Sequence, residues 1–174
     1  IENSLFQNGG TALYQNNGHY RYVYFNDNTI INADAIQYNW QCSYAEVKRN
    51  SITNGKIYIR SNMPTQSIPA DSISVIVHDN TLHFTEYDTD VAIDLNAYSY
   101  HTTAIITNNI ITGPHYRGIN VSGYYQVSAT ITGNTIDGSH NDGIRVDNLS
   151  KSIQIKYNNI NRAGASDCWQ CNDS

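Results

Sequence analysis

Two carboxylates near the end of the chain, Asp142 and Asp167, stand 25 residues apart. On neighbouring coils of a repeat of that length they would lie roughly 5 Å apart, the spacing of adjacent strands. Two close carboxylates cannot both ionise freely, so the pKa of one rises and the pair supplies one acid and one base or nucleophile. Glycoside hydrolysis needs such a pair. The spacing therefore makes Asp142 and Asp167 candidate catalytic residues.

Two histidines share the same spacing. His115 and His140 are also 25 residues apart and would align on neighbouring coils. Imidazole titrates near neutral pH, so either ring could act as a general acid or base. We assign His140 to the catalytic group and His115 to substrate binding. The alternative is that both are solvated loop residues.

Further side chains nearby suit a sugar ligand. Arg117 and Arg145 could neutralise an acidic sugar or hold a carboxylate bidentately. Tyr116 and Tyr124 each combine a flat ring with a hydroxyl, which fits a sugar face and a hydrogen bond. We also place Asp94 in this substrate-binding group.

Simpler interpretations compete with these assignments. Asp142, placed before Gly143, is a common turn residue that bonds its own backbone. Arg117 could balance Asp142 as a cross-strand pair worth at most about 1 kcal/mol. Asp88, Asp90 and Asp94 could ligate Ca²⁺ through oxygen atoms, although a solvated acidic loop also explains them. We therefore assign no metal site and no cofactor, with Ca²⁺ as the alternative.

A repeat would bring these residues together. Asn, any residue, then Ile or Leu recurs seven times, with spacings of 25, 22, 30, 29, 25 and 24 residues, starting at Asn3, Asn28, Asn50, Asn80, Asn109, Asn134 and Asn158. Short runs with period-two alternation flank each motif and predict strands. Asn suits a corner because it tolerates left-handed backbone and can form an amide ladder. One coil cannot bury its inward face alone, but stacked coils can.

The fold class follows from this repeat. We predict an all-β chain, a right-handed single-stranded parallel β-helix of about six to seven coils, with residues 1–174 as a single domain. Leucine-rich repeats would need Leu at fixed positions, and a β-sandwich would not repeat one corner motif at this period. The two long intervals place loops at Arg60–Ser72 and Phe84–Val91, where they could shape a groove.

Composition agrees with an all-β fold and excludes some partners. Tyr occurs 14 times, whereas Lys, Glu, Leu and Met, which favour helices, are scarce. The net charge of −5 argues against nucleic-acid binding, and no apolar run is long enough for membrane insertion. The three cysteines, Cys42, Cys168 and Cys171, are an odd number and are interpreted as packing residues.

Aligning the last coils defines an outward surface. The alignment pairs Ala92-Ile93, Gly118-Ile119, Gly143-Ile144 and Cys168-Trp169. It predicts three polar columns: Val91, Arg117, Asp142 and Asp167; Asp94, Asn120, Arg145 and Gln170; and Asn96, Ser122, Asp147 and Asn172.

A local run resembles a known superfamily. Asn141-Asp142-Gly143-Ile144-Arg145-Val146, followed by Ser166-Asp167-Cys168, is similar to the polygalacturonase pattern within the pectate-lyase-like β-helix superfamily. Arg145 stands where that pattern has Asp, Ser166 replaces the first Asp of its pair, and its later motifs are absent. The same architecture serves polysaccharide lyases, epimerases and bacteriophage tailspikes.

The resemblance implies a polysaccharide-degrading or polysaccharide-binding protein. We expect a tailspike depolymerase, either a hydrolase or a lyase, that is homotrimeric and located in the virion tail or secreted. The alternative is a non-catalytic β-helix segment of a phage fibre or secreted adhesin. Because the chain opens and closes within a coil, we expect it to be a fragment of a longer protein.

Overall fold

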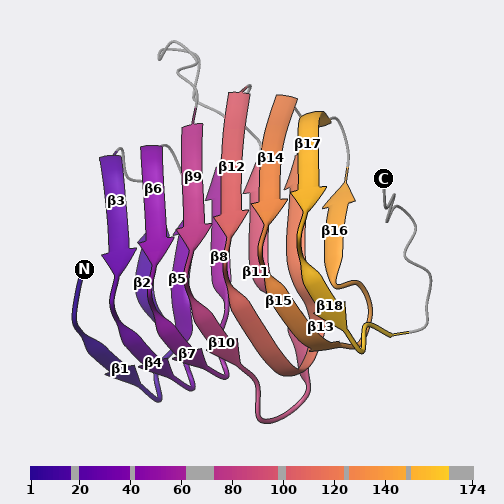
Figure 1. Cartoon of the computed structure of the whole chain (residues 1–174). Helices are drawn as coiled ribbons and strands as arrows, with labels where there is room; N and C mark the ends of the chain where they lie inside the picture. The colour runs from indigo at the N-terminus through magenta and orange to yellow at the C-terminus, as the bar shows by residue number, and fades with distance from the viewer. Residues whose placement is uncertain are drawn as a thin grey trace.

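The structure is a computed structural model that describes residues 1–16, 20–39, 42–61, 73–97, 101–123, 126–147 and 150–164. These residues form a parallel β-solenoid whose strands stack in chain order (Figure 1). Every pair of named strands is parallel, as the repeat predicts. In the described residues, no helix is long and apolar enough to cross a membrane.

Each coil contributes strands to three faces. The first, which we call the front sheet, has six strands in the order β17-β14-β12-β9-β6-β3. Their bounds are β3 (Tyr20–Asn26), β6 (Cys42–Lys48), β9 (Ile73–His78), β12 (His101–Thr107), β14 (Gln126–Thr132) and β17 (Ser150–Lys156).

The second face consists of short strands that follow each corner. They are β1 (Leu5–Gln7), β4 (Thr29–Ile31), β7 (Ser51–Thr53), β10 (Thr81–His83), the start of β13 (Ile110–Gly123), β15 (Thr135–Ser139) and β18 (Asn159–Asn161).

The third face, which we call the polar face, carries the candidate site. It contains β2 (Thr11–Asn16), β5 (Asp34–Asn39), β8 (Ile57–Ser61), β11 (Asp88–Ala97), the end of β13 and β16 (Ile144–Asp147). The long strand β13 pairs with β10 near its start and with β11 and β16 near its end, so it joins the second face to the polar face.

The solenoid has about five turns, rather than the six to seven coils that the motif count predicts. The reason is geometric, because the six strands of the front sheet are separated by five complete turns. The motif count includes the incomplete first and last coils.

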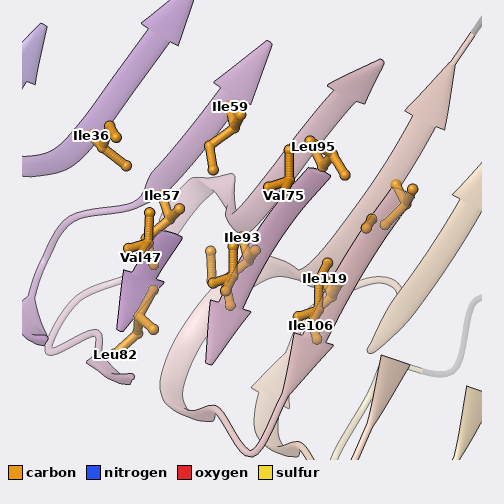
Figure 2. Packing of buried hydrophobic residues seen from close by; sticks show 14 of the residues in the cluster. Ile36, Val47, Ile57, Ile59, Val75, Leu82, Ile93, Leu95, Ile106 and Ile119 are labelled. Carbon is orange, nitrogen blue, oxygen red and sulfur yellow. The ribbon is translucent and has the colours of Figure 1, made fainter. Parts of the chain in front are cut away.

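Stacked aliphatic side chains fill the interior. On the polar face, one inward column consists of isoleucines at equivalent positions: Ile36, Ile57, Ile93, Ile119 and Ile144. Figure 2 shows several of them pointing into the same core as Val47, Val75 and Ile106 of the front sheet. Each isoleucine is at most 8% exposed. Period-two alternation sets this core, because alternate residues of a strand face opposite sides.

The recurrent asparagines form a buried ladder. Asn28 donates to Asn50, Asn50 to Asn80, Asn80 to Asn109, Asn109 to Asn134 and Asn134 to Asn158 through amides 2.9–3.0 Å apart. The ladder confirms the predicted corner. The left-handed backbone, however, belongs to the preceding residue, as at Asp27, Arg49 and Asp79, and not to the ladder asparagine.

The first corner was predicted in the wrong register. Leu5 pairs with Thr29 and Phe6 with Ile30, so Ser4 and not Asn3 is equivalent to Asn28. Leu5 consequently faces outward and is 61% exposed. Phe6 packs against the core instead.

A second, exposed asparagine ladder was not predicted. Asn32 donates to Asn8 and Asn54 donates to Asn32 across 3.1 and 3.0 Å, and all three have left-handed backbone. The signal in the sequence is a second Asn four residues after Asn28 and Asn50. In later coils this corner uses Gly113 and Gly138. A Cβ at Gly113 would overlap the Phe84 carbonyl oxygen.

Candidate functional site

A continuous outward column crosses the polar face. Strand register places these residues at equivalent positions on successive strands: Tyr14, Gln37, Tyr58, Asp94, Asn120 and Arg145. The predicted columns through Asp94, Asn120 and Arg145, and through Asn96, Ser122 and Asp147, are confirmed over the described coils. The column begins with an exposed tyrosine, has a carboxylate at its centre and ends with a cation.

A cavity of about 270 Å³ opens at the middle of this column. It is lined by Gln37, Lys56, Tyr58, Asp90, Val91 and Asp94. Strands β5, β8 and β11 supply these residues, with Lys56 placed just before β8. The lining therefore combines an aromatic ring, an amide, an ammonium group and carboxylates in one hollow.

Asp94 is held between two amides. Asn120 Nδ2 donates to Asp94 Oδ1 across 2.7 Å, and Asn96 Nδ2 donates to Asp94 Oδ2 across 3.0 Å. Burial raises the pKa of Asp94, and this effect exceeds the opposing effects of the two amides and of Lys56. Asp94 therefore retains its proton to higher pH than an ordinary aspartate, and both of its oxygens are fixed in position.

Lys56 provides the positive charge of the cavity. Its ammonium group contacts the Asp90 carboxylate and lies 4.0 Å from Asp34 Oδ2. Burial disfavours the charge, but these carboxylates outweigh that effect and raise the pKa of Lys56. Among the described residues, no three acidic, histidine or cysteine side chains converge to hold a metal. Asp88, Asp90 and Asp94 are accordingly not gathered into a three-carboxylate cluster.

Arg117 and Asp142 form an ion pair near the end of the polar face. Arg117 Nε lies 2.8 Å from Asp142 Oδ2, and both side chains are less than one-fifth exposed. The Arg117 guanidinium carbon lies 4.5 Å from the centre of the Tyr116 ring, within cation–π range. Asn141 and Arg117 donate to the Tyr116 hydroxyl across 3.0 and 3.3 Å. The structure thus brings Tyr116, Arg117 and Asp142 together.

Arg145 extends this cluster into solvent. Its Nε donates to Asp147 Oδ2 across 2.6 Å, while Nη1 lies 4.0 Å from Asp142 Oδ2. The Arg145 side chain is 40% exposed, compared with 17% for Arg117. Of the two arginines, Arg145 is therefore the more accessible to a ligand.

His115 does not occupy the predicted position. It pairs with Ser139 rather than with His140, because a register irregularity in β13 separates Thr112 from His115. The His115 side chain is fully buried. Its Nδ1 donates to the Gly113 carbonyl (2.7 Å), so Nε2 accepts from the Ser139 hydroxyl (2.8 Å). Burial lowers the pKa of His115, and the ring packs 5.3 Å from Phe84. A substrate cannot reach it in this position.

His140 lies on the surface, one residue beyond the equivalent of His115. Its backbone amide donates to the His115 carbonyl across 2.7 Å. Its ring lies edge-on to Tyr87, with the ring centres 5.3 Å apart. The predicted alignment of the two histidines is therefore wrong by one residue, and one ring faces inward while the other faces outward.

Some candidate residues fall outside the described part of the chain. These are Asp167, Tyr124, Cys168 and Cys171, while Cys42 lies in β6 without a described side chain. Gln37, Lys56 and Tyr58 were not predicted from the sequence, because the column alignment began at Ala92. Ile36 and Ile57, each followed by an outward polar residue, were the signal that could have extended it.

Comparisons of the chain with protein-family models, with curated proteins and with solved structures found no match. The structure establishes the parallel β-solenoid. The likeness to polygalacturonases is limited to the local sequence motif around Asp142 and Asp167.

Proposed function

We propose that this chain binds an extended polysaccharide along the polar face. The observation that carries the proposal is the unbroken column from Tyr14 to Arg145, with the cavity at Asp94 in its middle. A linear polymer fits such a column because successive strands present one side chain each at intervals of about 4.8 Å. Two tyrosine rings, two amides, one carboxylate and one guanidinium group then follow one another along the chain of sugars.

The charged end of the column favours an acidic sugar. Arg145 is accessible, and Arg117 lies behind it, paired with Asp142. A guanidinium group holds carboxylates well because its planar donors match their geometry. We infer that a uronate or similar anionic sugar binds near Arg145, with the polymer continuing past Asp94 toward Tyr14.

Binding can be tested by calorimetry with oligogalacturonides. Arg145→Gln should weaken binding by about tenfold, as expected for loss of a charge-assisted hydrogen bond. Lys156→Gln is the matched control, because it removes the same charge from an exposed position at the end of the front sheet. Equal affinities of both variants and the parent chain would refute binding on the polar face.

Hydrolysis is a second candidate function, favoured by the environment of Asp94. A carboxyl group with a raised pKa is protonated over a wider pH range, and in that form it can protonate the glycosidic oxygen as the C–O bond breaks. Water attacks the anomeric carbon, and a carboxylate accepts its proton. Asp90, paired with Lys56 at the same cavity, is the candidate base. The Asp142 and Asp167 pair proposed from the sequence remains the competing assignment.

A reducing-end assay on polygalacturonate separates these possibilities. If Asp94 is the acid, Asp94→Asn should abolish product formation and keep binding, whereas Asp142→Asn and Asp167→Asn should remain active. The reverse result would favour the sequence-based pair. Unsaturated products, detected by ultraviolet absorbance, would favour a lyase. If the parent chain binds polygalacturonate but releases no reducing ends, the result would favour the non-catalytic alternative.

The identity as a homotrimeric tailspike of a phage virion, or as a secreted protein, is a further proposal that rests on the resemblance to the β-helix superfamily and on the Asn- and Tyr-rich composition. Light scattering tests the trimer directly. A monomer or dimer at micromolar concentration would contradict it.

A further inference from the structure

A cluster of tyrosines occupies the outer surface of the front sheet at β3 and β6. Tyr22 and Tyr24 are neighbours on the outer side of β3, and Tyr44 pairs with Tyr22 from β6. Tyr22 is 60% exposed and Tyr24 46% exposed. We call these three residues the tyrosine cluster. It lies at the opposite end of the six-stranded sheet from β17, and on a different face from the cavity at Asp94 (Figure 1).

The rings of the cluster are close but do not stack on one another. The Tyr44 ring centre lies 6.3 Å from that of Tyr22, with an angle of 54° between the planes. It lies 5.6 Å from that of Tyr24, with an angle of 48°. Tilted rings at these distances leave ring surface and hydroxyl groups open to solvent. Side chains whose only role was to cover one another would be less exposed.

A fixed polar group borders the rings. Tyr44 donates its hydroxyl hydrogen to Glu46 Oε2 across 2.7 Å, and Lys48 Nζ lies 2.6 Å from Glu46 Oε1. Asn26 Nδ2 also donates to Glu46 Oε1, across 3.3 Å. Burial and the neighbouring Glu46 raise the pKa of Tyr44 to about 12, so this ring stays uncharged. The border thus has donors and acceptors in fixed positions, and the charges of Glu46 and Lys48 cancel.

The size of the cluster favours a small ligand. A tyrosine buries about 150–250 Å² when fully covered, so three partly exposed rings offer roughly 300 Å² in total. A stable protein interface needs about 800 Å² from each partner. Beyond Tyr44 the outer column continues with Ser74, and the column of Tyr24 continues through Glu46 with Ile76, both only partly exposed. The area therefore fits a short sugar chain better than a second protein.

We propose that the tyrosine cluster binds a short, uncharged oligosaccharide. A sugar ring has an apolar C–H face that can lie against an aromatic ring, and hydroxyl groups at its edge that can bond to the tyrosine hydroxyls. Glu46 and Lys48 form an ion pair beside the rings, so this border offers no net positive charge to a uronate. This site does not depend on the function proposed for the polar face.

Calorimetry with cellohexaose and maltohexaose tests the proposal on the whole chain. We expect one of the two to bind, and we expect Tyr22→Ala and Tyr24→Ala each to weaken that binding by about tenfold. Tyr22→Phe, which keeps the ring, should lose less. Tyr157→Ala is the matched control, since Tyr157 is 90% exposed at the far end of the front sheet and should have no effect. Arg145→Gln should also leave this binding unchanged.

Three results would overturn the proposal. One is the absence of binding to both hexasaccharides by a folded chain. Another is unchanged affinity in Tyr22→Ala and Tyr24→Ala. The third is concentration-dependent self-association that Tyr22→Ala abolishes, because a second copy of the chain would then cover the cluster. Thermal unfolding of each variant verifies that the fold is kept, as expected for residues so exposed.

Discussion

On the polar face, the environment of Asp94 differs from that of a solvated side chain. Its two oxygens each accept a hydrogen bond from a side-chain amide, one from Asn120 and one from Asn96, yet burial still raises the pKa of Asp94. The folded chain therefore stabilises the protonated form relative to the unfolded chain. This contribution to stability is present at low pH and is lost as the pH rises through the pKa of the folded state.

A carboxyl titration followed by NMR should place the pKa of Asp94 above its ordinary value of 3.8. Asn120→Leu should raise it further, because the substitution removes a hydrogen bond that favours the carboxylate and keeps the site buried. A lower pKa of Asp94 in the variant would contradict this account.

His115 should make the protein sensitive to mild acid. Burial lowers the pKa of His115 in the folded state, whereas the same imidazole in the unfolded chain titrates at about pH 6.5. Above that pH both states are neutral at this residue. Below it the unfolded chain gains a proton that the folded chain does not, so stability should fall by up to about 1.4 kcal/mol per pH unit until the folded pKa is reached.

Urea unfolding measured across this pH range checks the effect of His115. His115→Phe, which cannot titrate and keeps a ring beside Phe84, should show a shallower loss of stability as the pH falls. The slope is the informative quantity, because the variant also leaves the Gly113 carbonyl and the Ser139 hydroxyl without their partner. Identical slopes would assign the acid sensitivity to other groups.

At the scale of the elements, the asparagines at the two kinds of corner differ in how much they contribute to the stability of the fold. Asn80 is 1% exposed, and it donates to the Val47 carbonyl and to Asn109 while accepting from the Asn50 backbone and side chain. The second ladder, through Asn32, is exposed to water, which can replace its hydrogen bonds. The same residue type thus has a large energetic role at one corner and a small one at the other.

Asn80→Ala should lower the free energy of unfolding by about 3–5 kcal/mol, since each buried polar group left without a hydrogen-bond partner costs about 1–3 kcal/mol. Asn32→Gly is the control, because it removes an exposed ladder side chain while glycine suits the left-handed backbone there. It should cost less than about 1 kcal/mol. Chemical denaturation of both variants makes the comparison, and similar losses would show that burial does not separate the two ladders.

The strands and the buried ladder could be predicted because they repeat. Alternation around Ile93, Ile119 and Ile144 sets both the inward core and the outward columns, and the structure confirms that register. The first corner was misplaced because Asn3-Ser4-Leu5 matches the motif, although Phe6 is the residue that packs inside. A short motif without its packing partners cannot distinguish these two registers.

The candidate site was harder to predict than the fold. Equal spacing suggested that His115 and His140 align, but an irregularity in β13 changes the register before His115. The spacing of the residues in the sequence does not reveal such an irregularity. The cavity at Asp94 was missed because the column alignment began at Ala92 and because Lys56, which forms an ion pair with Asp90, precedes its strand.

At the scale of the whole molecule, the solenoid turns single side chains into a surface of defined length. The column from Tyr14 to Arg145 covers six strands of the polar face. With about 4.8 Å between neighbouring strands, its length is about 24 Å. Each added sugar of a bound polymer can contact a further strand until this length is reached.

Affinity for oligogalacturonides should therefore rise with chain length and reach a plateau once the oligomer spans about 24 Å. Tyr14→Ala, at the end of the column where the tyrosine is 55% exposed, should move the plateau to shorter oligomers and leave the affinity of the shortest ones unchanged. Arg145→Gln should weaken all lengths, because it removes the contact that fixes the acidic sugar. Calorimetry over an oligomer series measures both effects. An affinity that does not depend on length would mean that the ligand contacts the polar face at one point only.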